Sequence, residues 1–344
     1  MKMQTRGKLR RAIRRLQKLF VSKGLILMYH RVAEVDIDPW SLCVTPRHFA
    51  EHLEVLQKYC HPMTLQQLAK AQQDGNIPHR AVAVTFDDGY VDNLHHAKPL
   101  LERYNIPATV FVTTGHLGQE REFWWDELER VLLQPGRLPE TLSLVINGST
   151  HQWELGEAID YSQEDYRCDR DRKPWDGKPG SRLSFYYSIW KLLKPLPEAE
   201  QLKVMDDILT WAKAEPVFRS TYRSLLPEEV PVLGQGELVE VGAHTVTHPF
   251  LSAYSADFQQ HEIQRSKAYL EELLERPVIS FAYPYGNYTP ETVSLIREAG
   301  FNCACSTVAE TVWRDSDRFQ LPRFAVQNWN GNEFAKKLLR WFHD

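Results

Sequence analysis

Two adjacent carboxylates follow an apolar run that is typical of a buried strand. The segment AVAVTFDDGY, residues 81–90, is apolar or β-branched up to Phe86 and then places Asp87 beside Asp88. Neighbouring side chains on a strand point to opposite faces, and the glycine that follows indicates that the strand ends there and the backbone turns. Two carboxylates at the end of a strand, each with different neighbours, can act separately as a metal ligand and as a base.

The segment GAHTVTHPF places two histidines four positions apart, at His244 and His248. In a helical turn they lie on one face, where both can bind one metal ion, although such a pair alone is more often incidental. Thr245 occupies the position of the glutamate in H-E-x-x-H, which excludes a zincin motif. A third ligand must come from elsewhere. Asp88 is the candidate, because a carboxylate at a strand end suits zinc or a similar divalent ion. Asp87 would then lie beside the water on that ion.

These residues must be positioned by short apolar runs that end in polar residues or glycine. Such runs cover residues 25–30, 81–86, 108–115 and 238–244, and helix-like segments lie between several of them. Apolar strands that alternate with helices predict an α/β protein with a parallel sheet or barrel. In such folds ligand sites gather at the carboxyl ends of the strands, which is where the candidate residues lie.

Residues 119–231 interrupt this alternation. The stretch is rich in tryptophan, proline and charged residues and shows no clear succession of strands and helices, so we expect a largely helical insertion. The last segment, NEFAKKLLRWFHD, is typical of an amphipathic helix. The sequence therefore divides into a basic amphipathic tail at 1–24, a barrel at 25–118 and 232–330, the insertion at 119–231, and a C-terminal helix at 331–344.

Charge is distributed unevenly along the 344 residues. The net charge of −4 argues against a nucleic-acid-binding protein, but residues 1–24 contain nine cations and no acidic residue, which leaves −13 on the rest. A basic helix here would have one apolar stripe, formed by Leu9, Ile13, Leu16 and Phe20. Such a helix can lie on an anionic membrane surface, so we expect peripheral membrane contact through residues 1–24, with a frayed or self-docking helix as the alternative.

The five cysteines are scattered, which argues for free thiols in a reducing compartment. Nothing between Met1 and Gly24 forms the apolar core of a secretory signal, and no run elsewhere is long and apolar enough to span a bilayer. We therefore expect a cytoplasmic protein, located at the inner membrane surface if the basic tail binds lipid.

Three segments in combination resemble the polysaccharide deacetylase family, carbohydrate esterase family four, whose members are NodB-like. They are TFDDG at 85–89, HTVTH at 244–248 and the YPYG turn at 283–286. The resemblance covers roughly residues 25–118 and 232–330. It implies a distorted (β/α) barrel of the NodB type and the removal of acetyl groups from N-acetylated, sometimes O-acetylated, sugars.

The resemblance also implies a role for each matching residue. Asp87 takes the position of the general base. Asp88 takes that of a metal ligand, together with His244 and His248. The implied cofactor is a divalent metal ion, Zn²⁺ in the first place, with Co²⁺, Ni²⁺ or Mn²⁺ as alternatives.

The third motif departs from the family pattern. Its turn contains Pro284 and Tyr285, and the backbone N–H of Tyr285 falls where the family stabilises the oxyanion. The family commonly has an arginine before this pair that orients the base, but Ala282 occupies that position. Arg323, beside a later apolar strand, is a candidate replacement. That later strand also lacks the family's general-acid histidine. His30, in the early strand LMYHRV, resembles the acid of the circularly permuted branch, which is typified by poly-N-acetylglucosamine deacetylases.

Together these residues predict a metal-dependent deacetylase that hydrolyses N-acetyl groups of a carbohydrate or glycan intermediate, such as a lipid-linked or nucleotide-linked sugar. Trp124 and Trp125 either stack on that sugar or anchor the insertion to the barrel. Two alternatives stay open: a catalytically inactive carbohydrate-binding relative, which the missing arginine favours, and a metal-dependent amidohydrolase that acts on a non-sugar amide or ester. We expect an N-acetylated carbohydrate as partner and no nucleic acid.

Overall fold

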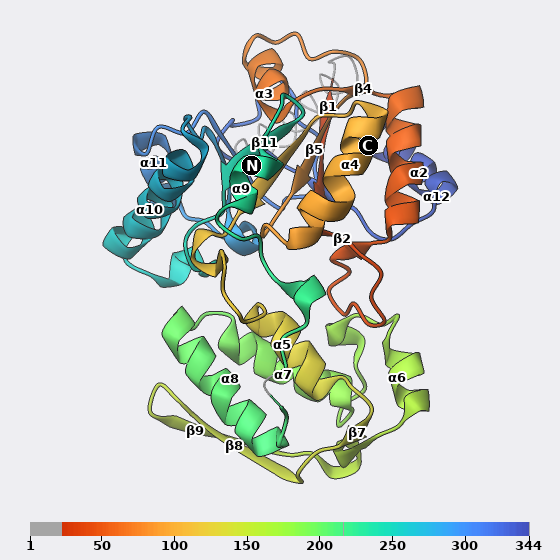
Figure 1. Ribbon diagram of the computed structural model, residues 1–344, viewed down its shortest axis with the longest axis vertical. Helices are drawn as coiled ribbons and strands as arrows, with labels where there is room; N and C mark the ends of the chain where they lie inside the picture. Colours follow the sequence, from red (N-terminus) through yellow and green to blue (C-terminus); the bar gives the residue numbers. More distant parts are fainter. Residues whose placement is uncertain (1–22, 216, 344) are drawn as a thin grey trace, which may run out of the picture.

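The computed structural model describes residues 23–215 and 217–343. The predicted basic tail and its membrane contact lie almost entirely outside these residues, so both stay predictions. In the part of the chain that is described, no helix combines the length and the apolar composition needed to cross a membrane. Figure 1 shows a sheet surrounded by helices in the upper half of the molecule and a smaller unit of helices and hairpins in the lower half.

A sheet of eight parallel strands forms the centre of the upper half. Every residue of the strands Gly24–Tyr29 and Ala81–Phe86 is buried, as expected for parallel strands whose two faces are both covered. The hydrogen-bonded order is β13 (Cys303–Cys305), β12 (Ser280–Ala282), β11 (Val239–Ala243), β6 (Ala108–Val112), β5 (Ala81–Phe86), β1 (Gly24–Tyr29) and β14 (Phe324–Ala325), and β4 (His61–Pro62) also pairs with β5.

Residues 321–325 close this sheet into a distorted barrel. On one side, β14 pairs with β1 in parallel. On the other side, Leu321 forms a parallel bridge with Cys305 of β13. The segment therefore joins the two ends of the strand order, and it carries Arg323 between them.

Helices surround the sheet (Figure 1). Side-chain caps fix where some of them start: the Thr45 hydroxyl accepts a hydrogen bond from the backbone N–H of His48, and the Ser255 hydroxyl from that of Phe258. A cap of this kind contributes about 1 kcal/mol. The helices are α2 (Pro46–Tyr59), α3 (Leu65–Gln73), α4 (Lys98–Tyr104), α9 (Glu229–Leu233), α10 (Ala256–Leu274), α11 (Pro290–Glu298) and α12 (Gly331–His343).

The strands bury side chains on both faces with the two-residue period of extended backbone. Leu25 and Leu27 belong to the core between sheet and helices, whereas Ile26 belongs to a smaller core inside the barrel. Cys303 and Cys305 also lie in the inner core. All five cysteines are free thiols, which confirms the prediction.

The lower unit is formed by most of the chain between β6 and β11, without α9, and has a hydrophobic core of its own. Helices make up most of it, but it also contains an antiparallel hairpin that we did not predict. The hairpin turns at Asn147 and Gly148, whose φ angles of 51° and 75° are both positive, as a type I′ turn requires. The elements are α5 (Trp124–Leu132), β7 (Gly136–Arg137), β8 (Thr141–Ile146), β9 (Ser149–Glu154), β10 (Asp160–Tyr161), α6 (Gln163–Asp169), α7 (Arg182–Leu193) and α8 (Glu198–Ala212).

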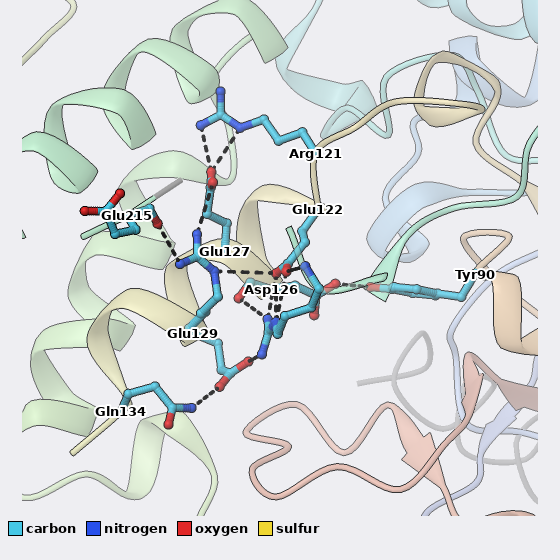
Figure 2. Close-up of polar contacts among 10 residues, drawn as sticks. Tyr90, Arg121, Glu122, Asp126, Glu127, Glu129, Gln134 and Glu215 are labelled. Atoms are coloured by element: carbon cyan, nitrogen blue, oxygen red, sulfur yellow. Dashed lines mark hydrogen bonds and ion pairs between the residues drawn. The ribbon is translucent and has the colours of Figure 1, made fainter. Parts of the chain in front are cut away.

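A network of ion pairs and hydrogen bonds connects the segments through which the chain enters and leaves the lower unit (Figure 2). Arg219 pairs with Glu122 at 2.7 Å and with Glu129 at 3.1 Å. The Tyr90 hydroxyl donates a hydrogen bond of 2.7 Å to Asp126 of α5. Because Tyr90 directly follows the Asp-Asp-Gly motif, α5 is tied to the segment that carries the candidate base.

Candidate active site

The carboxyl ends of the parallel strands bring the candidate residues together. Tyr29 of β1 pairs with Phe86 of β5, so His30 and Asp87 follow at neighbouring positions. His244 follows β11 in the same way. Strand ends are the usual location of ligand sites in α/β folds, and a short turn at each end releases the side chain from the alternation of the strand.

Asp88, His244 and His248 form a buried cluster with the dimensions of a metal site. Nε2 of His244 lies 3.5 Å from Oδ1 of Asp88, and Nε2 of His248 lies 3.4 Å from the same oxygen. One ligand atom from each residue can be chosen so that all lie within 4.8 Å of one another. Ligands about 2.1 Å from a tetrahedral ion are roughly 3.4 Å apart. The three residues therefore fit a zinc-sized cation and leave a position for water or substrate.

The surroundings of the two histidines differ, and both are compatible with metal binding through Nε2. Nδ1–H of His244 donates to the carbonyl oxygen of Ala282 at 2.7 Å, which leaves Nε2 free to face Asp88. Nδ1 of His248 is buried and has no hydrogen-bond partner among the described residues. Burial lowers the pKa of His248 to about 3, so this ring is neutral at pH 7.

Asp88 is held ionised at a sharp turn. Burial alone would raise its pKa, but its contacts with His244 and His248 hold the pKa below its usual value. Asp88 has a φ of 75° and Gly89 a φ of 78°. A Cβ on Gly89 would meet Val112 at 3.1 Å, so glycine permits the close approach of β5 to β6. The turn removes Asp88 from strand alternation, which lets both motif carboxylates reach one cavity.

The loop between the two histidines is held by Glu262, a residue that the sequence analysis missed. Glu262 lies on α10 and accepts hydrogen bonds of 2.8 Å from the backbone N–H groups of Val246 and Thr247. It also accepts one of 3.0 Å from the Thr247 hydroxyl. Thr245 and His248 have positive φ angles of 67° and 56°, which are costly for residues other than glycine. Glu262 therefore stabilises a strained turn that carries two candidate ligands.

Arg323 forms a buried bidentate ion pair with Asp87. Nη1 donates to Oδ1 and Nη2 to Oδ2, each at 2.7 Å, and Nε donates to the carbonyl oxygen of Ser306 at 2.9 Å. Burial alone would raise the pKa of Asp87, but the Arg323 guanidinium and His244 hold it below its usual value. The arginine suggested by the sequence thus contacts the candidate base, which the side chain of Ala282 cannot do.

A cavity of about 160 Å³ lies over these residues. His30 lines it together with Asp87 and the metal cluster, so His30 lies on the same side of the barrel as they do. The insertion and the loop before β3 (Cys43–Val44) supply much of the wall. The other lining residues are Trp40, Leu42, Trp125, Trp190, Tyr285 and Thr307.

The aromatic residues named from the sequence occupy different places. The Trp125 and Tyr285 rings lie 5.0 and 4.5 Å from the His248 ring and line the cavity. Trp124 is buried in the core of the insertion. Neither Trp124 nor Pro284 is among the residues that line the cavity.

Known proteins resemble this chain in segments that contain the Asp87-Asp88 motif and the two histidines. Residues 74–136 and 210–304 match the family model of polysaccharide deacetylases. The Bacillus subtilis protein YxkH is 30% identical over 144 residues, which are 39% of this chain and 48% of that protein. A poly-beta-1,6-N-acetyl-D-glucosamine N-deacetylase of Staphylococcus aureus is 29% identical over 112 residues, which are 29% of this chain and 39% of that enzyme. The matches therefore span about half or less of the length of these relatives.

A solved structure shares the fold over nearly the whole chain. IcaB from Ammonifex degensii superimposes with a TM-score of 0.56 and 19% identity, over 94% of this chain and 98% of that one. The likeness confirms the predicted distorted (β/α) barrel of the NodB type. The matches identify a polysaccharide deacetylase domain in residues 74–136 and 210–304, and the solved structure has the same fold around it.

Proposed function

We propose that this chain is a metal-dependent deacetylase that hydrolyses the N-acetyl groups of a carbohydrate or glycan intermediate. One observation carries the proposal: a single cavity is lined by the cluster of Asp88, His244 and His248, by Asp87 and by His30. The family match and the similarity to a poly-beta-1,6-N-acetyl-D-glucosamine N-deacetylase support an N-acetylated glycan as the class of substrate.

One carboxylate and two imidazoles are a donor set that suits Zn²⁺, and Co²⁺, Ni²⁺ or Mn²⁺ can use the same atoms. When Asp88, His244 and His248 bind such an ion, it supplies Lewis-acid polarisation of the acetyl carbonyl and lowers the pKa of a water molecule.

Asp87 accepts the proton of the attacking water. The two hydrogen bonds from Arg323 fix the plane of the carboxylate and still leave lone pairs that can accept a third. The lowered pKa keeps Asp87 ionised at neutral pH. It also makes Asp87 a weak base, which would be sufficient for a water molecule whose own pKa a bound divalent ion had lowered.

His30 donates a proton to the amine as the carbon–nitrogen bond breaks, because the nitrogen is too basic to leave as an anion. The ring is half-buried at the wall of the cavity, where the substrate nitrogen can reach it. We assign the backbone N–H of Tyr285, in the turn beside the same cavity, to the developing oxyanion.

Asp87→Asn and His30→Ala test these roles. Each substitution should lower kcat for acetate release from N-acetylated oligosaccharides by about 10²- to 10⁴-fold, the usual contribution of a general acid or base. Zinc affinity, measured by calorimetry, should stay close to that of the wild type. His79→Ala is the control, because His79 is exposed and does not line the cavity.

Full activity of both variants with zinc bound would contradict the assigned roles. Zinc binding without acetate release from any amino sugar would favour the inactive carbohydrate-binding alternative. Hydrolysis of small cyclic or linear amides in place of acetylated sugars would favour a non-sugar amidohydrolase.

A further inference from the structure

Four aromatic side chains form a cluster that extends outward from the cavity wall, which we call the aromatic platform: Trp40, Trp175, Tyr187 and Trp190. The Trp40 and Trp190 ring centroids are 4.1 Å apart, and Trp175 lies 6.1 Å from Trp40. Tyr187 lies 6.5 Å from Trp175 and 6.3 Å from Trp190. The rings come from the loop before β3, from the short 3-10 helix η4 (Pro174–Asp176) and from α7, so three separate segments converge on one surface.

The platform is continuous with the cavity. Trp40 and Trp190 line both, whereas Trp175 and Tyr187 lie beyond the cavity wall. Trp175 is 56% exposed. A single exposed aromatic residue is common on protein surfaces, but Trp175 continues a row of rings that reaches the cavity wall through Trp40 and Trp190.

The cavity is too small to enclose a glycan. Pockets that bury most of a drug-sized ligand have volumes of about 300–1,000 Å³, and this one has about 160 Å³. The acetamido group and part of its sugar ring can occupy it. Any further sugar of the substrate must lie outside, and the platform is the surface that begins where the cavity ends.

A cation lies at the junction between the two regions. Nζ of Lys194 is 5.1 Å from the centroid of Trp190, 4.6 Å from that of Phe250 and 4.6 Å from that of Tyr285. Within the described part of the chain it forms no ion pair. Its three N–H groups can therefore donate to hydroxyl or carbonyl oxygens of a sugar held between cavity and platform.

We propose that the aromatic platform binds the sugar unit next to the one that is deacetylated, so that the substrate is an oligomer or polymer of N-acetylated pyranoses and not a free monosaccharide. The apolar C–H face of a pyranose packs on an aromatic ring, while the hydroxyl groups at its edge stay in water or meet Lys194. This inference rests on the proposed function and adds to it the length of the substrate and the residues that recognise that length.

Trp175→Ala tests the platform. Wild type and variant are assayed for acetate release from β-1,4- and β-1,6-linked N-acetylglucosamine oligomers of one to five units. In the wild type, kcat/KM should increase from the monomer to the oligomers. In Trp175→Ala the ratio of oligomer to monomer kcat/KM should decrease by about tenfold, the usual size of one lost aromatic anchor, mainly through KM. Trp175→Phe should restore most of that ratio because it retains a ring.

Tyr269→Ala is the matched control, because Tyr269 is an exposed aromatic residue on α10 and does not line the cavity. It should leave the ratio unchanged. Thermal denaturation of each variant shows that it is folded. Equal kcat/KM for monomer and oligomers, or a Trp175→Ala effect that is the same for all lengths, would overturn the inference.

A binding measurement separates this inference from the proposed function. Oligomers are titrated into metal-free protein while the intrinsic tryptophan fluorescence is recorded. Binding that strengthens with oligomer length in the wild type and weakens in Trp175→Ala supports the platform. If no acetate is released from these oligomers or from 4-nitrophenyl acetate, that failure contradicts only the proposed function. Absence of length-dependent binding would overturn the platform whether or not acetate is released.

Discussion

Two adjacent carboxylates differ in role because they differ in partners. Asp88 faces two imidazoles, and Asp87 faces one guanidinium. Residue type and spacing in the sequence were enough to select both carboxylates and both histidines. Arg323 could be selected only from its place beside a strand, because nothing in LPRFAV indicates that its side chain crosses the barrel to reach Asp87.

Arg323→Lys keeps the positive charge but removes the bidentate contact. We expect kcat to decrease by about 10²-fold, as for other small misplacements of a reacting group. The acidic limb of the pH–rate profile should move to higher pH, because the pKa of Asp87 rises when two charge-assisted hydrogen bonds are lost. Arg297→Lys, in an exposed pair with Asp317, is the control. An acidic limb at the wild-type pH would exclude Arg323 as the group that lowers the pKa of Asp87.

At the scale of elements, the strand ends were predictable and the contacts between distant elements were not. The β8–β9 hairpin had a local signal, since Asn147-Gly148 lies between runs of alternating polarity, and it should have been predicted. Trp40 and Trp190 had no local sequence signal, because they meet only when the insertion packs on the loop before β3. Glu262 also had no local sequence signal. Helix α10 contains several acidic residues, and only the packing of the helix determines which of them contacts the loop between the two histidines.

Glu262→Gln should weaken zinc binding by about 10- to 100-fold, the range found for residues that orient metal ligands. The carboxamide keeps the shape of the side chain but is a weaker acceptor for the N–H groups of Val246 and Thr247. Competition with a chromophoric chelator measures the affinity. Glu272→Gln, on the same helix and outside the histidine loop, should bind zinc as the wild type does. Equal zinc affinities of the two variants would show that the loop between His244 and His248 keeps its conformation without Glu262.

At the scale of the whole molecule, barrel and insertion share one cavity. The barrel supplies the groups proposed for metal binding and proton transfer, and the insertion supplies Trp125 and Trp190. The sequence predicted an insertion at residues 119–231 but not what it contacts. Its packing on the barrel depends on a buried charge network drawn from separated segments (Figure 2).

That network makes stability depend on pH. Burial raises the pKa of Asp126 to about 7 and that of Glu129 to about 7, while carboxyl groups in unfolded chains titrate at about 4. Between about pH 4 and pH 7 the folded state therefore binds more protons at these two groups than the unfolded state. Their contribution to the free energy of unfolding decreases as pH rises through this window.

Urea denaturation at pH 5 to 8 measures this effect. The double variant Asp126→Asn, Glu129→Gln should lose less stability than the wild type between pH 5 and pH 7, because amides do not titrate. The amide oxygen introduced at position 126 can still accept the hydrogen bond from Tyr90. Parallel pH profiles for the two proteins would show that these carboxyl groups titrate normally in the folded state.

The segment 321–325, which closes the barrel, has a consequence for synthesis on the ribosome. Each of the three candidate ligands, together with His30 and Asp87, has been translated once residue 248 is in place, but Arg323 is added much later. A nascent or prematurely terminated chain that stops before this segment contains every residue proposed to bind zinc. Its barrel is not closed, however, and Asp87 lacks its ion pair with Arg323. The proposed hydrolysis therefore depends on β14 and the residues just before it, which are translated after all the other strands that the structure describes.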